Sequence, residues 1–189
     1  MEINIIKHFI TDEKCDELSS MIQQAKDDGK LSKWGQALVL EKPEPEYKEF
    51  IDVCAYNLIE KCRTLYGYKG KLWPEQQYFF SWETGTEHQQ HFDNNDMAFE
   101  HQGIKKEFRP YGLPELKFSS ILYLNDNYEG GEIFFPRLGR IIKPEKGDWI
   151  IFESDQMESE HGVKKIIEGT RYTLAQWLQT EPKWCGHGY

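Results

Sequence analysis

Three residues in this chain have the types and spacing of a metal site. His91 and Asp93 lie two residues apart, and this spacing places both side chains on the same face of a β-strand. His161, far along the chain, offers a third ligand from another strand. Two imidazoles and one carboxylate occupy one face of an octahedral ion and leave the other positions open, which is the donor set of non-haem Fe(II) sites. We therefore predict that His91, Asp93 and His161 bind Fe(II).

A single arginine beyond the third ligand has the chemistry to bind a carboxylate. Arg171 lies ten residues after His161, within the alternating segment 170–177. A guanidinium held in place by a strand binds a carboxylate through two parallel hydrogen bonds. We predict this role for Arg171, with Lys164 and Lys165 as alternatives. By alternation, the face that carries Arg171 also carries Thr173, Ala175 and Trp177.

The first third of the chain has the apolar periodicity of two helices. Residues 11–25 begin with Thr11 as an N-cap, continue with acidic residues in the first turn, and then carry apolar residues at helical spacing. A second helix is predicted from Pro45 to about Tyr66, where Gly67 and Gly70 end it. A short strand, Ile3 to Ile10, precedes the first helix.

From Gln76 onward, short β-branched and aromatic runs separated by Gly, Pro and Asn replace the helical pattern. Helices followed by such strands predict a mainly β fold of the α+β class. We expect a double-stranded β-helix, a cupin-like jelly roll, backed by the N-terminal helices. The chain is predicted to form one domain over 1–189, with the helices in 1–70 and the jelly-roll core in 76–180. The predicted strands are 76–83, 117–125, 131–136, 140–143, 148–153, 163–167 and 170–178.

Two connections bear on how the site residues meet. Glu168 and Gly169 read as a tight hairpin turn between the last two strands, which would place His161 and Arg171 on opposite arms of one hairpin. Residues 94–116 have no clear period, so they are either a lid or a surface insertion. Their position directly after the first two ligands favours a lid.

An ordered series of motifs surrounds these residues, and it is more specific than any one motif alone. With the His91-Phe92-Asp93 motif and Arg171, the series resembles the prolyl 4-hydroxylase-like branch of the 2-oxoglutarate/Fe(II)-dependent dioxygenase superfamily. The resemblance runs from about Trp82 to Leu178, roughly half of the chain. The other motifs are Phe118-Ser-Ser-Ile-Leu-Tyr-Leu-Asn125, Gly130-Gly-Glu-Ile-Phe-Phe-Pro136, Pro144-Glu-Lys-Gly147, Trp149-Ile-Ile-Phe152 and Glu160-His-Gly162.

The resemblance implies Fe(II), 2-oxoglutarate and O2 as reaction partners, with ascorbate as a further candidate cofactor. It implies hydroxylation of a C–H bond with release of succinate and CO2, and no catalytic protein residue beyond the metal centre is required. It further implies that the hydroxyl of Tyr123 reaches a carboxylate of 2-oxoglutarate. Ser119 shares the face of Tyr123 by alternation and is a candidate second donor, and Trp177 is expected to line the same cavity.

The resemblance implies a prolyl residue in a peptide or protein as the substrate, with a free amino acid or another small molecule as the alternative. Relatives often carry tyrosine at the positions of Trp82 and His88, so this chain departs from the pattern at both. We predict that Trp82, Arg137 and His101 meet the substrate. His88 precedes His91 by three residues, which predicts that it lies on the opposite strand face.

Composition disfavours several other classes of protein. The net charge of −9 disfavours a nucleic-acid partner, whose phosphates would be repelled. The sequence lacks the run of about 18 apolar residues that a membrane span needs, and its first residues lack the features of a signal peptide. Four scattered cysteines without a CxxC pair predict reduced thiols. Together these features predict a cytoplasmic protein and leave its oligomeric state open.

Two further functions stay open on the residues alone. A cupin-like metal-binding protein without oxygenase activity, such as an isomerase, would leave Arg171 and Tyr123 unexplained. A non-enzymatic binding module that uses the jelly-roll cavity would need no metal. A halogenase is disfavoured, because Asp93 supplies a carboxylate where a halide would need an empty position.

Overall fold

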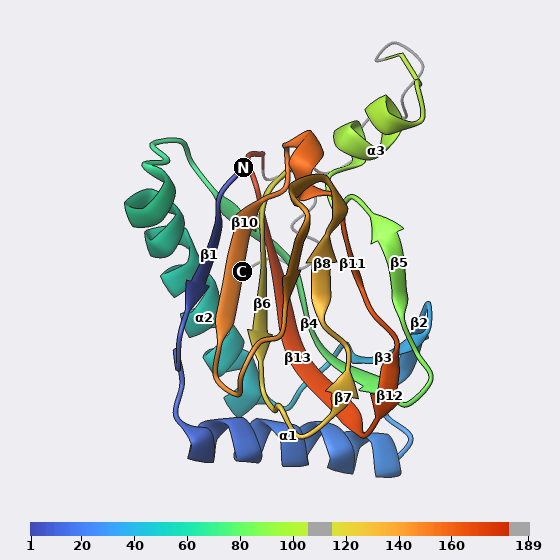
Figure 1. The fold of residues 1–189 in the computed structure, drawn as a ribbon. Coiled ribbons are helices and arrows are strands. Elements are labelled where there is room, and N and C mark those ends of the chain that lie inside the picture. Colours follow the sequence, from blue (N-terminus) through green and yellow to red (C-terminus); the bar gives the residue numbers. More distant parts are fainter. Residues whose placement is uncertain (106–114, 182–189) are drawn as a thin grey trace.

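A computed structural model describes residues 1–105 and 115–181 (Figure 1). Its helices are α1 (Asp12–Asp27), α2 (Pro45–Tyr66) and α3 (Asn95–His101), with 3₁₀ turns at Pro136–Leu138 and Met157–Ser159. Its strands are β1 (Ile3–Ile6), β2 (Ser32–Trp34), β3 (Ala37–Leu40), β4 (Trp73–Glu83), β5 (His88–His91), β6 (Leu116–Tyr123), β7 (Glu129–Gly130), β8 (Ile133–Phe135), β9 (Arg140–Ile142), β10 (Trp149–Glu153), β11 (His161–Val163), β12 (Ile166–Glu168) and β13 (Thr170–Gln179).

The two predicted N-terminal helices are confirmed. The side chain of Thr11 caps α1 by accepting a hydrogen bond from the backbone N–H of Lys14 at 3.3 Å. Proline begins α2, and Gly67 ends it in the left-handed conformation with a φ of 63°. The apolar faces of both helices are buried against the sheet, for example at Leu18 and Leu58.

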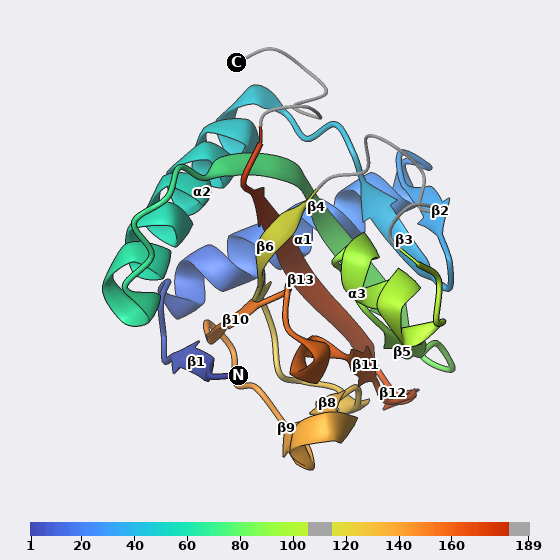
Figure 2. The same cartoon turned by 90° about the horizontal axis from the view of Figure 1, so that it is seen from above.

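Two facing sheets form the centre of the molecule. The larger has the strand order β1-β10-β6-β13-β4-β3-β2, and the smaller has the order β5-β11-β8-β9. Figure 2 shows α1 and α2 on one side of the larger sheet and the smaller sheet on the other side. The predicted jelly-roll core backed by helices is therefore confirmed.

Strand β13 is central to the site because it pairs with β4 on one side and with β6 on the other. The predicted alternation along β13 holds. Leu174 and Leu178 pack in the core beneath the helices, whereas the alternate residues face the space between the two sheets. These are Arg171, Thr173, Ala175 and Trp177.

The predicted hairpin between the last two strands is wrong. Strand β12 pairs with β7 in a separate two-stranded sheet, and β13 belongs to the larger sheet. His161 therefore lies on the smaller sheet and Arg171 on the larger one. The Glu168-Gly169 turn redirects the chain from one sheet to the other. His161 and Arg171 therefore reach the same cavity from opposite sheets.

The segment 94–116 is not irregular throughout, because α3 occupies its first part. Asn94 caps α3 by accepting a hydrogen bond from the N–H of Met97 at 3.2 Å, and its amide donates to the carbonyl of Leu116 at 2.6 Å. Residues 106–114 of the predicted lid lie outside the described residues. The strands β2 and β3, which were not predicted, extend the larger sheet beyond β4.

The cysteines that the structure describes are free and buried: Cys15, Cys54 and Cys62. Burial raises the pKa of Cys54 to about 12, so its thiol is protonated near neutral pH. No helix among residues 1–105 and 115–181 is both long and apolar enough to cross a membrane.

Candidate metal and co-substrate site

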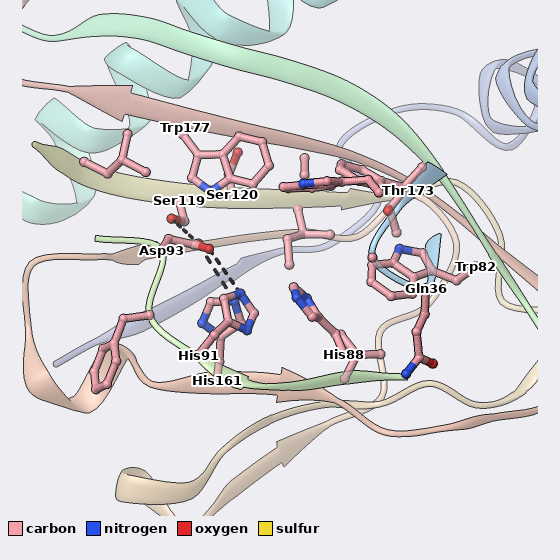
Figure 3. A pocket seen from close by; sticks show the side chains of 18 of the residues that line it. Gln36, Trp82, His88, His91, Asp93, Ser119, Ser120, His161, Thr173 and Trp177 are labelled. Atoms are coloured by element: carbon pink, nitrogen blue, oxygen red, sulfur yellow. Dashed lines mark hydrogen bonds and ion pairs between the residues drawn. The ribbon is translucent and has the colours of Figure 1, made fainter. Parts of the chain in front are cut away.

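The three predicted metal ligands converge between the two sheets. The candidate ligand atoms of His91, Asp93 and His161 all lie within 4.8 Å of one another. Nε2 of His91 is 3.3 Å from Oδ1 of Asp93, and Nε2 of His161 is 3.8 Å from Oδ2 (Figure 3). This donor set of two imidazole nitrogens and one carboxylate fits Fe(II).

The backbone reaches this arrangement by a different route from the one the sequence predicted. Strand β5 ends at His91, so Asp93 lies just beyond the strand and not on its face. His161 pairs with His91 and Val163 pairs with His88, so β5 has one residue more than β11 over this stretch. This β-bulge changes the alternation of side chains along β5.

The bulge overturns the prediction that His88 faces away from His91. The rings of His88 and His91 lie 3.9 Å apart between centroids, and His88 points into the cavity between the ligands and Trp82 (Figure 3). Gly162 permits the close approach of the β11 and β5 backbones at this bulge, because a Cβ there would lie 2.9 Å from the backbone carbonyl oxygen of His88.

Backbone carbonyls orient both ligand imidazoles. Nδ1 of His91 lies 2.9 Å from the carbonyl oxygen of Gln89, and Nδ1 of His161 lies 2.9 Å from that of Ser159. A carbonyl only accepts, so each Nδ1 carries the proton, and Nε2 of a neutral ring keeps its lone pair for a metal. Metal-binding histidines in proteins are commonly fixed in this way.

The protonation states of Asp93 and His161 also suit metal binding, whereas for His91 the effect of burial is outweighed by Asp93, which raises the pKa of this imidazole. Burial disfavours the charged form of Asp93, but His161, His91 and Ser119 outweigh it and hold the pKa of this carboxyl well below its usual range. Burial, together with His91, lowers the pKa of His161 to about 4. At neutral pH the carboxylate is therefore ionised and His161 is neutral, as metal ligation requires.

The metal cluster opens into a cavity of about 400 Å³ between the sheets. This volume lies within the range of small-molecule sites. Arg171 lines the same cavity, although its side chain comes from the opposite sheet. The cavity therefore combines a metal-type donor set with a guanidinium.

Arg171 has the properties of a carboxylate ligand. It is 2% exposed and donates one hydrogen bond from Nη1 to the carbonyl of Gly131 at 3.1 Å. Its Nε has no hydrogen-bond partner among the described residues. The guanidinium carbon lies 5.1 Å from the centre of the Trp82 ring. Trp82 is the residue of β4 that pairs with Arg171 of β13. A buried guanidinium with a free donor fits a carboxylate of 2-oxoglutarate.

Two buried phenols lie next to Arg171. The ring of Tyr123 is 5.6 Å from the guanidinium carbon, and burial raises the pKa of Tyr123 to about 12. Burial also raises the pKa of Tyr128, while the nearby charge of Arg171 acts in the opposite direction. Neither hydroxyl has a hydrogen-bond partner among the described residues. With Nε of Arg171 they are buried donors without a partner in the described part of the chain. Arg171 lines the cavity, and the two phenols lie behind it, outside the set of lining residues.

The structure places the other predicted site residues in two groups. Ser119, Trp82 and Trp177 line the cavity, and the hydroxyl of Ser119 donates to Oδ2 of Asp93 at 2.6 Å. Arg137 and His101 do not line it within the described part of the chain. They contact each other at 3.0 Å, and Arg137 also pairs with Glu160 at 2.7 Å.

Sequence reasoning missed part of the cavity wall. Trp34 and Gln36, at the β2–β3 turn, also line the cavity. The ring of Trp34 packs on Phe80 at 4.7 Å and meets Trp177 edge-on at 6.0 Å. The β2–β3 hairpin was not predicted, because its two strands are short and their sequence does not alternate between apolar and polar residues. Tyr128, which is buried near Arg171 and does not itself line the cavity, was missed because its position in a loop after β6 carries no periodicity.

Comparison with known families agrees with this geometry. Residues 76–179 match the family described as the 2OG-Fe(II) oxygenase superfamily, where 2OG denotes 2-oxoglutarate. This match covers more than half of the chain, so the protein belongs to that superfamily. The predicted family membership is thereby confirmed.

Among curated relatives, prolyl 3-hydroxylases match part of the chain. Human prolyl 3-hydroxylase 2 is 39% identical over 70 residues, which are 34% of this chain and 10% of that protein. Prolyl 3-hydroxylase 1 from Gallus gallus is 33% identical over 101 residues, which are 51% of this chain and 14% of that protein. The matched segment thus spans only a small part of these longer relatives.

Solved structures share the fold over nearly the whole chain. A viral collagen prolyl hydroxylase from Paramecium Bursaria Chlorella virus-1, in complex with 2OG, has a TM-score of 0.75 at 21% identity and covers 96% of this chain and 97% of that one. A prolyl hydroxylase from Trichoplax adhaerens, in complex with a hypoxia inducible factor peptide fragment, has a TM-score of 0.71 at 18% identity, over 99% of this chain and 87% of that one. The fold is therefore that of the prolyl 4-hydroxylase-like branch.

Proposed function

We propose that this protein is a 2-oxoglutarate-dependent Fe(II) hydroxylase that acts on a prolyl residue in a peptide or protein and releases succinate and CO2. The observation that carries the proposal is the pairing of a partly buried His-Asp-His cluster with a buried guanidinium in one cavity. A metal-binding protein without oxygenase activity would have no use for Arg171 and the two phenols beside it.

In this proposal His91, Asp93 and His161 hold the metal, and the two histidines do so through Nε2. Bound Fe(II) supplies the activation of O2 that no protein side chain can provide. Backbone carbonyls orient both imidazoles, and the neighbouring groups keep Asp93 ionised and His161 neutral.

The same proposal assigns 2-oxoglutarate to the Arg171 side of the cavity. Arg171 binds the distal carboxylate, and the hydroxyls of Tyr123 and Tyr128 donate to it. Trp82 packs over the guanidinium, which favours a role in the co-substrate pocket over its predicted contact with substrate. Trp177 lines the cavity at the pairing position opposite Ser119.

The substrate assignment is supported by the aromatic side of the cavity. We define the aromatic rim as Trp34, Phe80 and Trp177, which line the cavity; the ring of Trp34 contacts the other two. Trp34 is 47% exposed. Aromatic-lined grooves are a common means of binding proline-rich peptides, and the relatives and solved structures compared above are named as prolyl hydroxylases. His101, the last residue of α3, and Arg137, which contacts it, are candidates for contacting the rest of the peptide.

The decisive experiment is a turnover assay with Fe(II), O2 and 2-oxoglutarate. Proline-containing peptides, proline-free peptides and free proline are compared, with succinate and hydroxylated product measured in parallel. We expect wild type to add the mass of one oxygen atom to prolyl peptides, and we expect Asp93→Ala to leave their mass unchanged. NMR of the hydroxylated residue then distinguishes carbon 3 from carbon 4.

Each other outcome points to a specific revision. Hydroxylation of free proline alone would favour the small-molecule alternative. Metal binding without any 2-oxoglutarate turnover, with or without ascorbate, would favour a cupin-like protein with another activity. Failure to bind Fe(II) or 2-oxoglutarate would remove the proposal altogether.

A further inference from the structure

Three buried serines connect the carboxylate ligand to the distal histidine. The hydroxyl of Ser119 donates to Oδ2 of Asp93 at 2.6 Å (Figure 3), and the hydroxyls of Ser119 and Ser154 lie 2.5 Å apart. The hydroxyl of Ser159 then donates to the backbone carbonyl of Ser154 at 3.0 Å. All three serines are at most 1% exposed.

The direction of these hydrogen bonds follows from counting protons. Asp93 is ionised and only accepts, so Ser119 gives its one proton to Oδ2. Ser154 must therefore donate to Ser119. The oxygen Oδ1 of Asp93 stays on the side of His91, at 3.3 Å from Nε2. A carboxylate held in this way has one oxygen fixed by the protein and the other left toward the metal cluster.

The chain of contacts closes on the other ligand. The backbone carbonyl of Ser159 accepts from Nδ1 of His161 at 2.9 Å. The segment 154–159 includes a 3₁₀ turn. Its Ser154 is hydrogen-bonded to Ser119, the partner of Asp93, and the carbonyl of its Ser159 orients His161. These contacts link two ligands that lie 68 residues apart in the sequence and on different segments of the fold.

We propose that Ser119, Ser154 and Ser159 form a positioning network that presets Asp93 and His161 for the metal. The inference rests on the metal centre of the proposed function. It also assigns Ser119 a different role from the predicted second donor to 2-oxoglutarate, because the single proton of Ser119 is already committed to Asp93. Residues that orient metal ligands typically contribute about 10- to 100-fold to metal affinity.

The test measures metal affinity directly, by anaerobic titration of the metal-free protein with Fe(II) and with Co(II). The variants are Ser119→Ala, Ser154→Ala and Ser159→Ala, with Ser119→Thr as the variant that keeps the hydroxyl. Ser81→Ala is a matched control, since Ser81 is also a buried strand serine that donates to a carboxylate, Glu83, at 2.7 Å. Circular dichroism and urea unfolding check that each variant folds.

We expect Ser119→Ala and Ser154→Ala to weaken metal binding by about 10- to 100-fold, with a smaller loss for Ser159→Ala, whose carbonyl remains. Ser119→Thr should bind close to wild type, and Ser81→Ala should bind as wild type. The half-saturating concentration of 2-oxoglutarate at saturating metal should stay unchanged in Ser119→Ala.

Wild-type affinity in Ser119→Ala and Ser154→Ala would overturn the network while leaving the proposed function intact. So would an equal loss in Ser81→Ala, because the effect would then be one of general stability. An increased requirement for 2-oxoglutarate with unchanged metal affinity would return Ser119 to the co-substrate. Failure of wild type to bind either metal would remove both the network and the proposed function.

Discussion

Two regions of one cavity are built by different physical means. We define the polar core as His91, Asp93, His161, Ser119 and Arg171; its members are held by hydrogen bonds to backbone carbonyls and to each other. The aromatic rim is held by ring contacts and includes the exposed Trp34. The polar core is thus fixed in direction, whereas the rim provides area with few directional constraints.

This difference separates the reaction from the choice of substrate. Hydrogen-bonded groups in a buried site keep a defined geometry, and the loss of one leaves its partner unpaired. Ring contacts at a half-exposed position tolerate substitution at small cost. We therefore expect the polar core to determine metal and 2-oxoglutarate binding, and the rim to determine affinity for the peptide.

The largest effect should come from removing a metal ligand. Asp93→Ala and His161→Ala each delete one member of a donor set of three. They should lower metal affinity by more than the serine variants do and abolish succinate release. The measurement is metal titration alongside the turnover assay. Asp27→Ala, which removes an exposed carboxylate on α1, serves as the control. Full turnover in Asp93→Ala would remove this residue from the ligand set.

The second effect tests the other end of the polar core. Arg171→Ala should raise the half-saturating concentration of 2-oxoglutarate by about 10- to 100-fold, since hydrogen bonds to charged groups contribute about 1.5–3 kcal/mol. Metal affinity should not change, because Arg171 is not a ligand. Arg171→Lys should raise the half-saturating concentration of 2-oxoglutarate by less than Arg171→Ala does, because lysine keeps the positive charge. It should still bind less well than wild type, because lysine lacks the bidentate geometry. An unchanged dependence on 2-oxoglutarate in Arg171→Ala would contradict the assignment.

A smaller effect separates the two phenols. Tyr128→Phe should raise the requirement for 2-oxoglutarate by about tenfold, the low end of what one hydrogen bond to a charged group contributes (about 1.5–3 kcal/mol). Without ligand, its thermal stability should equal or exceed that of wild type, because an unpartnered buried hydroxyl is removed. Tyr123→Phe provides the comparison. If only Tyr123→Phe changes the 2-oxoglutarate requirement, Tyr128 is a packing residue.

The sequence predicted the residues of the polar core better than their backbone geometry. His161 and Arg171 were found from residue type and local alternation, and β13 keeps that alternation because it is paired on both sides. The predicted orientation of His88 was wrong. It depends on a bulge that arises only when β5 pairs with β11, which local sequence does not reveal. The predicted hairpin between the last two strands was also wrong because of a long-range pairing: β12 pairs with β7 and not with β13.

The rim and the serine network were beyond local prediction for another reason. Trp34 lies on a three-residue edge strand whose residues are all exposed, so it has no pattern of burial to detect. Ser154 and Ser159 lie in a turn, and their meaning depends on Ser119 from a distant strand. Such contacts follow from tertiary structure and leave no period in the sequence.

The smallest effect tests whether the rim acts independently of the polar core. Trp34→Ala removes a ring that packs on Phe80 and Trp177, and aromatic pairs of this kind contribute about 0.5–1.5 kcal/mol. We expect KM for a prolyl peptide to rise by about 2- to 10-fold, while metal affinity and the 2-oxoglutarate requirement stay near wild type. Trp34→Phe should recover part of the loss. Independence requires that Trp34→Ala and Arg171→Ala combine additively, as sites without shared partners usually do. A double variant with strongly non-additive kinetics would show that rim and polar core act as one unit, and the division between reaction and substrate choice would then fail.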